Sequence, residues 1–426
     1  MADTPLRSTL WRGCRQRRTL ALLAALALLA PAVAAEEGDP PPRFTFGVFG
    51  TLGLVYSTED RADFIVNPVR PDGPGRSKSV SPDPDSLIAG QVTFQATPKL
   101  TAVVQVVAEQ TADDDYDPNL EWANLRYEFT PDFSVRAGRL ALPAFLVSEH
   151  RKVSYATPWI RPPIELYSIV PVTSLDGVEA TFRRHSGDWT RTFDASFGRS
   201  EAEFPGGAGS AVAKDAWNVN ATFERGGFTG RVAAATAKLD VDAFEPLFNA
   251  FRLFGPEGES IAERFEVDET PFVFATAGVE YDPGRWFAIA EVGWLDTDSV
   301  LGESLAGYVT GGVRLGSVAP YATYSRREVL SESSVRGLSL AGLPPDLIPV
   351  AAGLNAGLNG ILRGTPVQQN LAVGGRWDFT TGMALKLQVD FVDVLEGSAG
   401  TFSNQTPGSE PIDDARLVSL AAVFVF

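Results

Sequence analysis

The chain has 426 residues, of which 44% are hydrophobic and 21% charged, so its composition is not that of a disordered protein. One Cys and two His exclude a disulfide framework and a Cys-based metal site, and they disfavour a His-rich one. The formal net charge of −17 argues against a nucleic-acid-binding protein, which needs a basic surface. Forty Gly and 27 Phe favour strands and turns. Beyond residue 35 no apolar run is long enough for a membrane helix.

The first 35 residues have the pattern of a secretory signal peptide. Five arginines precede an apolar stretch at residues 20–30, and the small residues at 31–35 suit a signal peptidase. The alternative is a membrane anchor, but this apolar stretch is short for a span. We therefore expect a signal peptide at 1–35, a short periplasmic lead at 36–43 and the folded protein at 44–426.

The rest of the chain alternates between apolar and small or polar residues, with the period of two that is typical of β-strands. In the first such segment Phe44, Phe46 and Val48 alternate with Thr45 and Gly47. The pattern predicts sixteen strands, at residues 44–57, 86–97, 99–109, 120–130, 132–140, 176–185, 188–200, 214–225, 227–238, 271–281, 285–296, 305–316, 317–329, 367–379, 382–393 and 415–426.

The connections between these segments alternate strictly between short and long. The short ones have tight-turn sequences such as Thr130-Pro131-Asp132 and Asp282-Pro283-Gly284. An antiparallel meander with short turns at one end and long loops at the other is the design of an outer-membrane barrel. We therefore predict an all-β fold, a sixteen-stranded antiparallel transmembrane β-barrel.

The two faces of the predicted strands agree with a membrane barrel. One face is apolar, and the other carries residues such as Gln91, Asn124 and Asn218, which suit a lumen too wide for side chains to fill. Aromatic residues such as Phe129, Tyr281 and Trp377 gather near strand ends, as in interfacial aromatic belts. The alternative, aromatic residues that cap a soluble β-core, does not explain this spacing.

The last strand alternates and ends in Phe424 and Phe426, which resembles the assembly signal that targets bacterial outer-membrane barrels to the barrel-assembly machinery. Residues 125–139 also resemble the strand, turn and strand that precede the third loop of porins. The mature chain as a whole resembles the sixteen-stranded porins of Gram-negative bacteria. The resemblance implies a location in outer-membrane lipids, a homotrimer and passive diffusion of small hydrophilic solutes, without a cofactor. The acidic motif of the family's constriction loop is not evident, which leaves the solute selectivity open.

Loop three, at about residues 141–175, has an unusual composition for a solvated loop, with five prolines and many apolar residues. We expect it to fold into the barrel and to form the pore constriction. The candidate constriction residues are Glu149, His150, Arg151, Lys152, Arg161 and Glu165. By strand parity the barrel wall adds Arg126, Glu128, Arg136, Glu179 and Arg183 to the pore lining. The alternative is a solvated charge cluster on an external loop.

The charges of loop three predict the ion preference of the pore, because charges at the narrowest point are screened least. Arg151, Lys152 and Arg161 favour a weakly anion-preferring or nearly unselective pore. If Glu149 and Glu165 neutralise them together with Glu179, the acidic outer loops favour cations instead.

Three other loop features carry weaker signals. Asp113, Asp114 and Asp115 could ligate a divalent cation, but no calcium-binding loop pattern is present, so a solvated charge run is expected and no metal site is predicted. The phenylalanines and leucine at 244–251 have helical spacing, which predicts a short amphipathic helix at the barrel mouth, with a ligand gate as the alternative. Residues 338–364 could fold over the mouth or contact a neighbour.

An enzyme is not expected. His150 lies near Ser148 and His185 is adjacent to Ser186, but neither pair has an identifiable third catalytic residue. The sequence therefore predicts an outer-membrane diffusion porin. The alternatives are a channel of the same fold that selects anionic solutes through Arg151, Lys152 and Arg161, and a structural or adhesion barrel with a plugged lumen.

Overall fold

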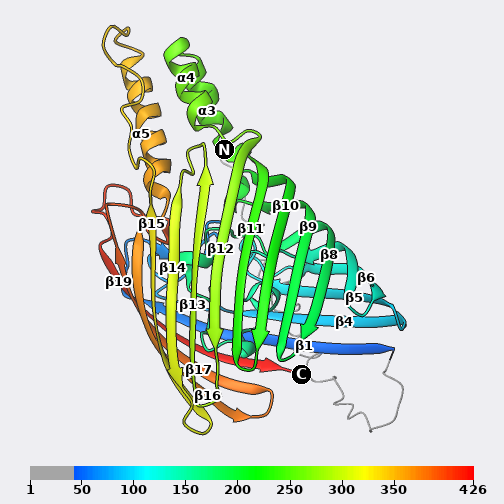
Figure 1. Ribbon diagram of the computed structural model, residues 1–426. Helices are drawn as coiled ribbons and strands as arrows, with labels where there is room; N and C mark the ends of the chain where they lie inside the picture. The colour runs from blue at the N-terminus through cyan, green and yellow to red at the C-terminus, as the bar shows by residue number, and fades with distance from the viewer. Residues whose placement is uncertain (1–42) are drawn as a thin grey trace, which may run out of the picture.

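The computed structural model describes residues 43–426, in which sixteen long antiparallel strands close into one β-barrel (Figure 1). The predicted signal peptide and almost all of the predicted periplasmic lead lie outside the described residues. The long strands are β1 (Phe44–Ser57), β4 (Leu87–Thr97), β5 (Leu100–Glu109), β6 (Asn119–Thr130), β7 (Phe133–Ala141), β8 (Ser174–Ser186), β9 (Trp189–Glu203), β10 (Ser210–Arg225), β11 (Phe228–Val241), β12 (Thr270–Tyr281), β13 (Trp286–Thr297), β14 (Ser304–Val313), β15 (Val318–Val329), β16 (Gln368–Thr380), β17 (Met383–Val394) and β19 (Asp414–Val425).

Each long strand pairs with its neighbours in the chain, and the first and last strands close the sheet. Strand β1 pairs with β4 on one side and with β19 on the other, from Phe49 opposite Val425 to Ser57 opposite Leu417. Closure leaves no free edge, which is a requirement for strands that cross a lipid bilayer. The predicted sixteen-stranded antiparallel barrel is therefore confirmed.

The strand boundaries differ from the predicted ones by at most four residues. The largest difference is in β10, which starts at Ser210, four residues before the predicted start. The pairing of β10 shifts between Ala213 and Ala216, and Asp215 between them has a φ of 49°. This β-bulge interrupts the alternation, so the pattern in the sequence becomes regular only after it.

Three short strands in the long loops have no counterpart in the prediction. Strand β3 (Val80–Ser81) pairs with β1, and β2 (Asp63–Phe64) pairs with β18 (Phe402–Ser403). The second pair joins the first and last long loops, and the rings of Phe64 and Phe402 pack edge to face across it. Two-residue strands are too short to produce a periodic signal.

The two faces of the wall differ as expected. Outward-facing side chains such as Leu52, Leu125 and Leu387 are more than half exposed, as suits a surface that lipid covers. Aromatic side chains pack in pairs on this face near the short turns, for example Tyr281 against Trp286, with 5.3 Å between ring centroids. The inward-facing residues are mainly polar on β4–β10, whereas β12–β15 turn Phe274, Phe287 and other large side chains inward.

The helices of residues 43–426 all lie in the loops. They are η1 (Ser148–His150), η2 (Ser154–Ala156), α2 (Ile164–Tyr167), η3 (Pro205–Gly207), η4 (Asp242–Phe244), α3 (Glu245–Arg252), α4 (Pro256–Phe265) and α5 (Ile348–Gly364). No helix within residues 43–426 is long and apolar enough to cross a membrane.

Helices α3, α4 and α5 stand together beyond the long-loop end of the barrel (Figure 1). The loop between β11 and β12 forms α3 and α4, one helix more than the sequence predicts, with Gly255 at a φ of 74° at the break. Phe248 and Phe251 of α3 share an apolar cluster with Phe265 of α4 and Leu358 of α5. The predicted apolar face of this segment therefore packs on the loop that follows β15.

Candidate functional site: loop three and the lumen

Loop three, which spans residues 142–173 in the structure, is hydrogen-bonded to inward-facing side chains of distant strands. The carboxylate of Glu291 on β13 accepts hydrogen bonds from the backbone N–H of Leu146 at 2.7 Å and from the hydroxyl of Tyr167 at 2.8 Å. The indole N–H of Trp159 is 2.9 Å from Thr310 Oγ1 on β14 and 3.1 Å from Thr323 Oγ1 on β15. These contacts place both halves of loop three against the inner face of the wall.

A second group of contacts surrounds Lys386 on β17, whose side chain is almost completely buried. Its ammonium group donates to the carbonyl oxygen of Thr157 at 2.7 Å and also to those of Ser154 and Trp159. Charge-assisted hydrogen bonds of this kind are stronger than neutral ones. They hold the turn at residues 154–159 against β17.

An apolar cluster fills the space between loop three and strands β12–β15. Phe145 and Tyr167 of loop three stack with 4.5 Å between ring centroids, and Phe145 also packs edge to face on Phe274. Trp159 packs at right angles on Tyr308 at 5.6 Å. The prolines and apolar residues that distinguish loop three in the sequence thus contribute to a core that it shares with the wall.

The three basic residues that the sequence assigns to the constriction all have partners. The guanidinium of Arg151 donates to the carbonyl oxygens of Tyr167 at 2.7 Å and Val170 at 3.3 Å. Lys152 forms ion pairs with Glu109 at 2.8 Å and Glu121 at 2.7 Å, on β5 and β6.

Arg161 is the third of these basic residues, and its partner is an acid that sequence reasoning missed. Its guanidinium pairs with Asp85 at 2.9 Å, and the Asp85 side chain is fully buried. Arg161 also donates to Ser419 on β19. Asp85 lies in the loop before β4, 76 residues before Arg161 in the chain.

The other three candidates of loop three differ in environment. Glu149 is the most exposed of them and lies 3.2 Å from Arg136 on β7. Burial lowers the pKa of His150 below its usual value. Glu165 is fully buried, accepts hydrogen bonds from Ser325 and Gln368, and has a pKa that burial raises.

The wall candidates lie on the polar side of the barrel. Arg136 pairs with Glu179 at 2.6 Å, and Arg126 lies 3.4 Å from Glu128. Arg183 donates to Thr192 at 3.3 Å. Most of the positive charge on this wall is therefore balanced by neighbouring carboxylates.

Above this wall, loop three borders a polar vestibule of about 590 Å³. Its charged lining residues comprise Arg70, Asp85, Glu109, Asp113, Asp115, Glu121, Arg139, Arg151, Lys152, Arg161, Glu201 and Glu203. Seven of these twelve are acidic, so the vestibule has a slight excess of negative charge.

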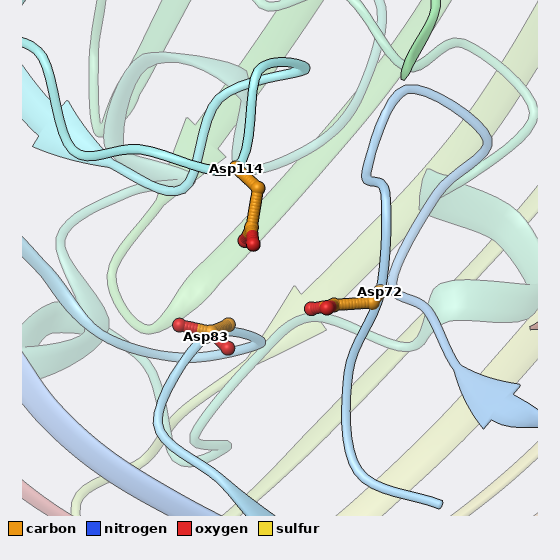
Figure 2. Close-up of side chains that lie close together, drawn as sticks. All are labelled: Asp72, Asp83 and Asp114. Carbon is orange, nitrogen blue, oxygen red and sulfur yellow. The ribbon is translucent and has the colours of Figure 1, made fainter. Parts of the chain in front are cut away.

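The acidic run of the second long loop contributes one residue to a carboxylate cluster. Figure 2 shows Asp114 beside Asp72 and Asp83, with ligand oxygens within 4.8 Å of one another. Lys78 forms ion pairs with Asp83 at 3.0 Å and with Asp72 at 3.3 Å. The ammonium group of Lys78 thus neutralises two of the three carboxylates. The cluster links the first two long loops.

The two histidines lie far apart in the structure. His150 is in loop three, and His185 hydrogen-bonds Thr190 across the turn between β8 and β9. No hydrogen bond joins either imidazole to a serine hydroxyl within residues 43–426. The Ser–His arrangements considered from the sequence are therefore not assembled as hydrogen-bonded pairs.

Several contacts between loop three and the wall were not predicted from the sequence, although the strand alternation places their wall residues on the inner face. Glu291 and Lys386 occupy inward positions on strands with regular alternation, and both are charged. A charged residue among inward positions indicates a partner in the lumen, but the alternation cannot name that partner.

Comparison with known proteins shows similarity of structure but not of sequence. No known family model matches the chain, and no curated protein matches it. OmpF of Salmonella typhi, in a complex with daunomycin, aligns with a TM-score of 0.53 at 13% identity, over 90% of this chain and 97% of that chain.

Two further solved structures are similar to the same extent. The outer membrane channel DcaP of Acinetobacter baumannii has a TM-score of 0.52 at 12% identity, over 91% of this chain and 99% of that one. An anion-selective porin from Comamonas acidovorans has a TM-score of 0.50 at 11% identity, over 90% and 99%. The chain therefore has the fold of outer-membrane porins and channels.

Proposed function

We propose that the protein is an outer-membrane channel for passive diffusion of small hydrophilic solutes and ions. The observation that carries the proposal is a closed barrel with an apolar outer face, a polar inner wall on β4–β10 and a loop bonded to the inner face of the opposite wall. Loop three then narrows the passage, and solutes pass along its polar side. No bond is made or broken in this function, so the proposal includes no enzymatic activity.

The ionic contacts of loop three indicate how the channel treats charge. Arg161 and Lys152 are paired with buried or half-buried carboxylates, and the Arg151 guanidinium bonds to carbonyl oxygens. We propose that these residues mainly hold loop three in place. With the slight acidic excess of the vestibule, the expected result is a nearly unselective pore, and the anion-selective alternative is less favoured.

A second candidate function, a structural barrel with a plugged lumen, is favoured by one observation. The cluster of Phe145, Trp159 and Tyr167 with Phe274 and Tyr308 fills the β12–β15 side of the lumen. If the cluster extended across the polar side, the barrel would be closed to solutes.

Swelling of liposomes distinguishes the two functions. Vesicles that contain the purified protein should swell in isotonic arabinose, more slowly in a disaccharide, and not in a large dextran. Absence of swelling in arabinose, with the protein correctly inserted, would favour the plugged barrel.

The triple change Arg151→Ala, Lys152→Ala, Arg161→Ala tests the role of the three basic residues. If they anchor loop three, the variant should swell faster in the disaccharide because the loop is released. A changed ion preference at unchanged size exclusion would instead favour the anion-selective channel.

We also propose that the barrel acts as a homotrimer in outer-membrane lipids, exported by the predicted signal peptide and inserted by the barrel-assembly machinery. A groove on its outer face, lined by small residues such as Gly230, Ala277, Ala290 and Gly307, supports close contact between barrels. Cross-linking in native membranes should give a band at three times the monomer mass.

A further inference from the structure

A second cavity lies beside the polar vestibule, and it is mainly apolar. Its volume is about 470 Å³, within the range of cavities that hold small organic ligands. It is lined by residues of β9–β13 and β15 and by the long loops that follow these strands, among them Phe204, Phe244, Phe272, Leu295 and Ile361. Loop three contributes Leu142, Ala144 and the segment 168–172.

In the part of the chain that the structure describes, Arg327 is the one charged residue that lines this apolar cavity. Arg327 is on β15 and only 8% exposed. Its Nη1 lies 3.4 Å from Ser168 Oγ, and its Nε has no hydrogen-bond partner among residues 43–426. No carboxylate in residues 43–426 lies within the 4.0 Å of an ion pair with its guanidinium. Arg327 thus differs from Arg161 and Lys152, whose charges are paired.

The nearest acidic group does not complete the site. Both carboxylate oxygens of Glu165 are engaged, one with Ser325 at 2.6 Å and the other with Gln368 at 2.7 Å. A buried guanidinium without an anionic partner is unfavourable, and its planar fork matches a carboxylate in a bidentate manner.

We infer that this cavity is a binding site for an amphipathic monocarboxylate, whose carboxylate pairs with Arg327 while its apolar body contacts the phenylalanines and Leu295. The cavity shares Asn67, Val69, Pro171, Val172 and Ala202 with the polar vestibule, so the two spaces adjoin. The inference rests on the proposed channel function and adds a preferred solute class to it.

Isothermal titration of the detergent-solubilised protein with 3-phenylpropionate tests the site directly, because binding does not require conduction. Acetate has the charge without the apolar body, and 3-phenyl-1-propanol has the body without the charge. Both should bind at least about 10-fold more weakly than 3-phenylpropionate. The change Arg327→Gln should weaken binding of 3-phenylpropionate by about 10- to 100-fold, as expected for loss of a charged hydrogen-bond donor.

A matched control is Arg336→Gln, which removes one positive charge from an exposed position on the loop after β15 and should leave binding unchanged. If Arg327→Gln does not fold, Ala235→Phe gives a second test, because Ala235 lines the cavity and a larger side chain there should fill it. Equal binding of 3-phenyl-1-propanol and 3-phenylpropionate would overturn the inference. So would wild-type affinity for 3-phenylpropionate in Arg327→Gln or in Ala235→Phe. Loss of liposome swelling with binding intact would instead count against the channel function alone.

Discussion

Glu291 illustrates how a single inward-facing side chain can hold a loop inside a wide barrel. Its carboxylate accepts hydrogen bonds from Leu146 and Tyr167 of loop three and, at 3.3 Å, from Tyr308 on the neighbouring strand. A buried carboxylate is costly unless donors surround it, and here two of the three donors come from the loop. The Glu291 carboxylate therefore favours the one position of loop three in which Leu146 and Tyr167 can donate to it.

The change Glu291→Ala should loosen loop three without opening the barrel. It leaves the Leu146 N–H and the Tyr167 hydroxyl without their acceptor, and each lost charged hydrogen bond costs about 1.5–3 kcal/mol. We expect noisier single-channel currents and faster cleavage of loop three by an added protease. Glu280→Ala is the control. Glu280 also faces inward, on the adjacent strand β12, but within residues 43–426 it forms no hydrogen bond with loop three. Equal noise in both variants would contradict this role.

Asp83 gives a pH dependence to the first long loop. Burial alone would raise its pKa, but hydrogen bonds from Ser81, Lys78 and Tyr116 outweigh burial and hold the pKa below its usual value. A carboxylate with a lowered pKa stabilises the folded loop above about pH 4 and loses this contribution as the pH falls further.

Amide hydrogen exchange at residues 78–86, corrected for intrinsic rates, should therefore become faster between pH 5 and pH 2.5. Asp83→Asn should show fast exchange already at pH 5 and little change on acidification. In the control Asp113→Asn, at an exposed position, the wild-type pH profile should persist. A wild-type profile in Asp83→Asn would refute the assignment.

At the scale of elements, the strands were predictable because lipid and lumen impose opposite demands on alternate residues. Two features could not be predicted in this way: the register shift at Ala213–Ala216 and the pairing of β2 with β18. Neither produces a regular period in the sequence. The composition of loop three drew attention to the segment, but its partners could not be read from the sequence. Asp85 and Arg161 are 76 residues apart in the chain and meet only in the folded protein.

The last strand supports a prediction about assembly. Phe426 exchanges two backbone hydrogen bonds with Val48 on β1, at 2.7 and 2.9 Å, and its ring stacks on Phe424. Phe426→Ser keeps the backbone bonds and removes the ring, whereas deletion of Phe426 removes both. Both changes should lower the steady-state level in the outer membrane, but Phe426→Ser should refold in detergent nearly as well as the wild type.

The control for this experiment is Phe379→Ser, which removes an outward-facing aromatic ring near a different short turn. Its outer-membrane level should stay close to that of the wild type. A normal level of Phe426→Ser would show that the terminal ring is not an assembly signal.

At the scale of the whole molecule, the barrel is asymmetric. On the β12–β15 side, loop three and large inward side chains form a packed core, whereas the β4–β10 side remains polar. Helices α3, α4 and α5 extend from the long-loop end, and within residues 43–426 no helix lies at the short-turn end (Figure 1). Solute passage thus depends on whether the polar side is continuous past loop three.

Single-channel recording in a planar bilayer tests this central claim most directly. With KCl on both sides, insertion of the purified protein should give discrete conductance steps, and a KCl gradient should give a reversal potential near zero because the charges of loop three are largely paired. Verified insertion without any conductance step would contradict the proposed channel.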